Sequence, residues 1–111
     1  MAKECFVAFI DKRLQKSYDT LKTGRSEDST LQEKINHAID SLKNDPGYGI
    51  RIPHDRIPDF YKKKYGIDNL RKVNLPDGWR LLYTVKADKT GIISVIIEWL
   101  SHTEYERRFG Y

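Results

Sequence analysis

Four side chains in the second half of the chain are of the types that act on a phosphodiester: Lys72, Arg80, His102 and Tyr105. Arginine and lysine bind phosphate oxygens and neutralise the charge that grows on them during a reaction. Histidine is the commonest acid–base group near neutral pH, and in a helix His102 and Tyr105 would lie on the same side because they are three residues apart. The set, with Glu98 as a further candidate, predicts acid–base chemistry on a phosphate.

Each of these side chains also has an ordinary structural interpretation. Arg80 could form an ion pair with Glu98 and have no other role. His102 could be a surface histidine, and Tyr105 could be an aromatic residue that only packs. The residues alone leave both interpretations open.

Other kinds of site have no motif in this chain. The three histidines are far apart, and no pair has the spacing of metal ligands. There is no phosphate-binding glycine loop, no dinucleotide fingerprint and no serine-centred nucleophile elbow. Cys5 is the only cysteine and is interpreted as a small strand residue. We therefore expect no metal and no cofactor.

A β-hairpin over residues 69–85 is predicted to position Arg80. A Pro-Asp-Gly turn separates two runs that alternate in polarity, which is a strong hairpin signal. Successive side chains of a strand point to opposite faces, so one face of the second strand is apolar. The members of that face are Trp79, Leu81, Tyr83 and Val85.

The expected pairing gives the hairpin a polar cluster on its other face. If Leu75 pairs with Trp79, then Asn74 lies opposite Arg80. Lys72 projects from the same face two residues before Asn74. Polar and cationic side chains on rigid strands are well placed to bind a phosphate.

A nearly unbroken apolar run at residues 92–100 predicts a strand in the interior of the sheet. If Val85 pairs with Ile93, then Arg80 faces Glu98 across the two strands. Under this register the face of the sheet that no helix covers carries Lys72, Asn74, Arg80, Thr84, Ser94 and Glu98.

The remaining elements follow from apolar periodicity and from glycine and proline. They are a strand at 4–10, helices at 11–23 and 31–42, a loop at 45–58, a helical turn at 59–65, and a tail at 101–111 that is a short helix or an extended arm. We expect one α+β domain over residues 1–111: an N-terminal strand, a two-helix hairpin and a three-stranded antiparallel meander, with the helices on one face of the sheet.

Composition places further limits on function. With 111 residues, 39% of them hydrophobic and 32% charged, the chain suits a single core. No run of about 18 apolar residues is present, so no membrane partner is expected. The N-terminus lacks a secretory pattern and the single thiol fits a reducing compartment, so a cytoplasmic location is expected.

The net charge of +4 is concentrated in one segment. Residues 51–73 contain seven basic and three acidic side chains, including the run Lys62, Lys63 and Lys64. A local basic patch favours a polyanionic partner such as nucleic acid, or an acidic protein segment. The alternative is a solvated face without a partner.

The chain resembles the RelE/ParE superfamily of toxins from toxin–antitoxin pairs along nearly all of its length. The sequence Trp-Arg-Leu-Leu-Tyr at 79–83 resembles the family's aromatic-Arg-aliphatic-x-Tyr strand. His102-x-x-Tyr105 resembles the ending that follows the last strand. The fuller pattern, which extends to Phe109, resembles a subgroup that we associate with archaea. The resemblance implies a RelE-like fold.

RelE-like toxins cut messenger RNA in the ribosomal decoding site, where the RNA 2′-hydroxyl attacks its adjacent phosphate. The resemblance implies that Arg80 holds this phosphate and that Tyr105 takes part in proton transfer. His102 matches a position where some relatives carry a basic or imidazole side chain. Asn74 stands where the best-known members have a second strand lysine. The residues assigned to RNA and phosphate binding are Lys72, Asn74, Arg71, Lys62, Lys63 and Lys64.

The resemblance also implies partners and alternatives. A toxin of this kind would bind a cognate antitoxin, typically a small acidic protein, as well as the ribosome and messenger RNA. ParE-like relatives share the fold but act on DNA gyrase and lack the nuclease residues. A decayed, non-catalytic protein with the same fold is the third possibility.

Overall fold

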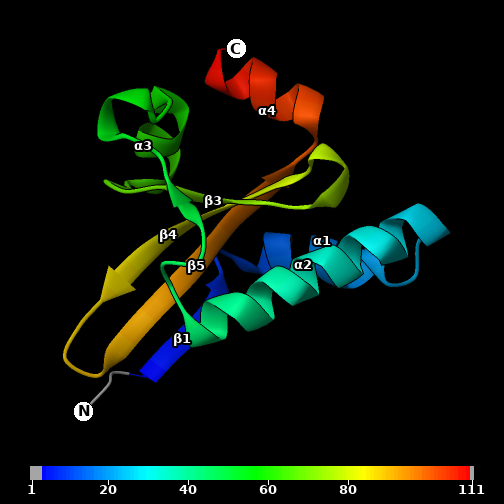
Figure 1. Ribbon diagram of the computed structural model, residues 1–111, viewed down its shortest axis with the longest axis horizontal. Coiled ribbons are helices and arrows are strands. Elements are labelled where there is room, and N and C mark those ends of the chain that lie inside the picture. The colour runs from blue at the N-terminus through cyan, green and yellow to red at the C-terminus, as the bar shows by residue number, and fades with distance from the viewer. Residues whose placement is uncertain (1–3, 111) are drawn as a thin grey trace.

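The computed structural model describes residues 4–110, which form a mixed sheet flanked by helices (Figure 1). The strands are β1 Glu4–Phe9, β2 Ile50–Arg51, β3 Arg71–Asn74, β4 Arg80–Ala87 and β5 Gly91–Leu100. The helices are α1 Lys12–Leu21, α2 Ser26–Asn44, α3 Asp59–Tyr65 and α4 His102–Phe109, with short 3-10 turns η1 His54–Arg56 and η2 Pro76–Gly78. The expected α+β class is confirmed.

Capping residues and a glycine near the helix ends determine where the helices begin and end. The Asp11 carboxylate caps α1 by accepting the backbone N–H of Leu14 at 2.8 Å. α2 begins at Ser26, earlier than its apolar stripe, and has acidic residues in its first turn, where they favour a helix N-terminus. Gly66 ends α3 in the left-handed conformation at φ 63°, as the sequence predicts.

The sheet has the strand order β1-β5-β4-β3-β2. β1 runs parallel to β5, and the other neighbours are antiparallel. β5 therefore lies in the interior, as its apolar sequence predicts. β2 is a strand that the sequence analysis missed, because it contains only two residues in a segment rich in glycine and proline; its Ile50 pairs with Lys72.

The register of the β3–β4 hairpin is confirmed. Asn74 pairs with Arg80, and the N–H of Leu75 donates to the carbonyl of Trp79 at 2.8 Å. The turn between them needs two positive φ angles, 62° at Asp77 and 82° at Gly78. Aspartate and glycine are residues that adopt this region most readily, so the Pro-Asp-Gly sequence and the turn agree.

The expected register between β4 and β5 is wrong. Val85 pairs with Ser94 instead of Ile93, a shift of one residue that is already present at the turn, and a bulge at Ile97 adds a second residue, so that Arg80 pairs with Leu100. The shift at the turn places Ser94 on the face of α1 and α2, where it is buried, while Thr84 stays on the opposite face. The unbroken apolar run of β5 has no alternation from which the register could have been predicted.

Helices cover both faces of the sheet, so the expectation of helices on one face is also wrong (Figure 1). Leu81 and Leu82, successive residues of β4, belong to two separate apolar clusters. The first cluster contains the α2 side chains Leu31, Ile35, Ala38 and Leu42. The second contains Tyr61 of α3 and Tyr105 of α4. These aromatic side chains bury the face that was expected to be open.

Within residues 4–110, no helix combines the length and the apolar character that crossing a membrane requires.

Candidate functional site

Arg80 is the first residue of β4 and lies next to the η2 turn. Its Nη1 donates to the carbonyl of Gly78 at 2.7 Å and to the carbonyl of Trp79 at 3.2 Å. The Nε atom is buried and has no hydrogen-bond partner. The turn therefore holds one end of the guanidinium in place and leaves part of its donor capacity unused.

Arg80 does not face Glu98, as the sequence register predicted. It pairs with Leu100, whereas Glu98 pairs with Leu82. The Glu98 carboxylate instead lies 3.3 Å from Nη1 of Arg108 on α4. Among residues 4–110, no carboxylate forms an ion pair with Arg80, so its charge remains available to an anion.

Lys72 and Arg80 meet at the ring of Tyr105. Lys72 Nζ lies 5.0 Å and Arg80 Cζ lies 5.4 Å from the ring centroid. Cations at this distance are attracted to an aromatic face. Tyr105 itself is only 4% exposed, because its ring stacks on Phe109 at a centroid distance of 4.4 Å. Two strands and one helix thus bring three predicted site residues together.

A capping box fixes the start of α4. The Ser101 hydroxyl accepts the N–H of Glu104 at 3.2 Å, and the Glu104 carboxylate accepts the N–H of Ser101 at 3.0 Å. The hydrogen bonds to Ser101 lower the pKa of Glu104, the backbone bond most of all. The tail is therefore the helix that was one of its two predicted forms, and its first turn carries His102 and Tyr105.

His102 lies at the edge of this group. Its side chain is exposed, and its Nε2 is 2.5 Å from the Glu106 carboxylate, one helical turn further on. Its Cβ also packs against the η2 turn, since a Cβ placed on Gly78 would lie 2.9 Å from it. His102 thus contacts the same turn whose carbonyl holds Arg80. Glu106 was missed by the sequence analysis, although its i, i+4 spacing from His102 is visible there.

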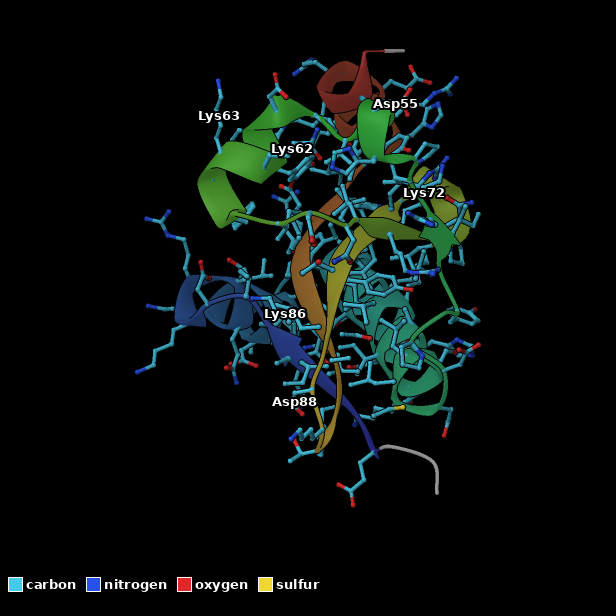
Figure 2. The ribbon with its side chains drawn as sticks, turned by 90° about the vertical axis from the view of Figure 1, so that its left-hand side faces the viewer. Asp55, Lys62, Lys63, Lys72, Lys86 and Asp88 are labelled. Atoms are coloured by element: carbon cyan, nitrogen blue, oxygen red, sulfur yellow. The ribbon has the colours of Figure 1, made fainter. Side chains whose placement is uncertain are left out.

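Of the other predicted RNA-binding residues, the structure places Asn74 beside this group and the remaining four outside it. Asn74 lies opposite Arg80 and is exposed, so it borders the group. Arg71 projects from the other face of β3, where its Nη1 donates to the carbonyl of Gly49 at 3.0 Å. Lys62 and Lys63 are on α3, well away from Lys72 (Figure 2). Lys64 lies over the Phe60 ring at 5.3 Å and is also outside the group.

The candidate site consists of Lys72, Asn74, Arg80, His102 and Tyr105, and is called the hairpin–α4 site below. Its chemistry is that of an anion site with a phenol and an imidazole beside it. Within the described part of the chain, no group of three or more His, Cys, Asp or Glu side chains could hold a metal ion.

Comparison with known proteins finds no relatives: no protein-family model, curated protein or solved structure matches the chain.

Proposed function

We propose that this protein is a RelE-like toxin of a toxin–antitoxin pair, an endoribonuclease that cleaves messenger RNA on the ribosome in the cytoplasm. The observation that carries the proposal is the meeting of Lys72 and Arg80 at the ring of Tyr105, with no carboxylate paired to either cation among residues 4–110. A cognate antitoxin, a small acidic protein, would bind such a toxin and block its cationic site.

The proposed reaction needs only groups of the RNA and of the hairpin–α4 site. The RNA 2′-oxygen attacks the adjacent phosphorus and forms a 2′,3′-cyclic phosphate, while the bond from phosphorus to the 5′-oxygen breaks. Arg80 and Lys72 neutralise the charge that grows on the phosphate oxygens. Neutral His102 accepts the proton of the 2′-hydroxyl, and Tyr105 gives its phenolic proton to the leaving 5′-oxygen.

Substitutions of Arg80 and Tyr105 test this proposal. Expression of the wild type should arrest growth and cut messenger RNA in a translation extract, with a cyclic phosphate at the new 3′ ends. Arg80→Ala and Tyr105→Phe should each reduce the cleavage rate by about 100-fold or more, because each removes a group that acts in the transition state. Lys89→Ala, a change at an exposed cation far from the site, is the matched control and should cleave like the wild type.

Thermal unfolding of each variant separates chemistry from stability. A wild type that neither arrests growth nor cuts messenger RNA would contradict the proposal.

A toxin without nuclease activity, such as a gyrase-directed ParE-like protein, is the second candidate function. Two observations favour it: Tyr105 is almost fully buried, and Asn74 stands where a second lysine would be expected. In that case Arg80→Ala and Tyr105→Phe would leave growth arrest intact, and messenger RNA would stay whole. The same variants therefore distinguish the two functions.

A further inference from the structure

An exposed aromatic ring on α3 has two cations close to it. Phe60 is 41% exposed. Arg108 Cζ lies 4.1 Å and Lys64 Nζ lies 5.3 Å from the centroid of its ring. The Glu98 carboxylate, 3.3 Å from Nη1 of Arg108, joins this guanidinium to β5 and holds it beside the ring.

Lys63 extends this arrangement along the helix. Phe60, Lys63 and Lys64 follow the i, i+3, i+4 spacing and therefore share one face of α3. Both lysines are exposed, and neither has an ion-pair partner among residues 4–110. In Figure 2 Lys63 extends outward from the helix, on the side away from Lys72. We call Phe60, Lys63, Lys64 and Arg108 the α3 patch.

We propose that the α3 patch is a second binding surface of this protein and that its ligand is single-stranded nucleic acid. Sequence-tolerant binding of single strands combines cations along the backbone with aromatic rings on which bases stack. Phe60 supplies the ring, and Lys63 and Lys64 supply the phosphate contacts. An acidic peptide would use the two lysines but has no base to place on the ring, so the exposed phenyl group favours nucleic acid.

The proposal goes beyond the proposed nuclease function, because binding at α3 requires no cleavage. If both hold, one RNA strand would contact the protein at two separate places, with α3 holding it outside the hairpin–α4 site. Binding and cleavage can be measured separately with a probe that cannot be cut.

The test uses a fluorescein-labelled 2′-O-methyl oligouridylate of about twelve residues, which covers the usual site size and has no free 2′-hydroxyl. Fluorescence anisotropy gives its dissociation constant at several salt concentrations between about 50 and 200 mM. Lys63→Gln with Lys64→Gln should weaken binding about tenfold and lower the slope of log K against log salt by about 1.4, since each phosphate contact to a single strand contributes about 0.7.

Phe60→Leu should weaken binding about fivefold without changing the salt slope, because it removes the stacking surface and no charge. The matched control is Lys12→Gln with Lys16→Gln, two exposed lysines on one face of α1. It loses the same net charge and should bind within about twofold of the wild type.

Three results would overturn the proposal: a wild type that does not bind the probe at low salt, a control variant that loses as much affinity as the α3 variant, or a Phe60→Leu variant that binds normally. A failure of the nuclease proposal appears only in the cleavage assay, and is thereby distinguished from a failure at α3.

Discussion

Gly78 is the residue on which the packing of α4 beside Arg80 depends. It has φ 82°, and a Cβ at this position would lie 2.9 Å from the Cβ of His102. Gly78→Ala therefore combines backbone strain with a clash against a helix, and we expect a loss of about 2 kcal/mol or more in the free energy of unfolding. Urea unfolding followed by circular dichroism measures this loss.

Gly66→Ala is the matched control for this substitution. Gly66 also has a positive φ, 63°, but nothing lies within 4 Å of a Cβ built there. It should cost only the strain of the left-handed conformation, about 1 kcal/mol. Equal losses in the two variants would contradict the close packing of His102 against the turn.

The pairing of Arg80 with Asn74 could be predicted from the sequence, and its relation to Glu98 could not. The hairpin prediction rests on a turn motif and on strict alternation, both of which are local. The position of Glu98 depends on a bulge inside an apolar run and on Arg108, ten residues further along the chain. Long-range partners of this kind leave no pattern in a single sequence.

At the scale of elements, α3 and α4 are the helices whose role was missed. A helical turn at 59–65 was predicted and is confirmed as α3, and a short helix was one of the two predicted forms of the tail that became α4. Their apolar side chains, however, are few and mostly aromatic, and they form no long stripe of helical period. The second cluster was therefore predicted as an open polar face.

The start of α4 has a stability that depends on pH. Hydrogen bonds to Ser101 lower the pKa of Glu104 in the folded protein. A carboxylate with a lowered pKa stabilises the fold above its ordinary value of 4.5, and this stabilisation is lost as the pH falls through the folded pKa. The amide oxygen of Glu104→Gln can still accept the N–H of Ser101, but the amide does not titrate. We therefore expect this variant to lose the pH-dependent contribution of Glu104 to the free energy of unfolding.

Urea unfolding between about pH 6 and pH 3 measures the effect, because the wild type should lose its advantage over Glu104→Gln within this interval. Ser101→Ala removes the hydroxyl cap and should cost about 1 kcal/mol at pH 6. If the free energies of unfolding of the wild type and Glu104→Gln differed by the same amount across the whole interval, folding would not change the pKa of Glu104.

At the scale of the whole molecule, one strand joins two cores. β4 sends Leu81 into the cluster beneath α2 and Leu82 into the cluster beneath α3 and α4, and both side chains are 0% exposed. The hairpin–α4 site lies at one end of this strand, so its geometry depends on both layers. Covalent continuity through β4 predicts that the two layers unfold together.

Leu81→Ala and Leu82→Ala test this coupling. Each substitution should cost about 2–5 kcal/mol, because each leaves a cavity in a packed cluster. Trp79 and Trp99 pack only against the first cluster, so their fluorescence reports on the α2 layer. In a cooperative molecule, Leu82→Ala must lower the urea midpoint seen by tryptophan fluorescence as much as the midpoint seen by circular dichroism. If the α3–α4 layer unfolded on its own, Leu82→Ala would leave the fluorescence transition at its wild-type position, and the hairpin–α4 site could then lose α4 while the rest of the sheet remained folded.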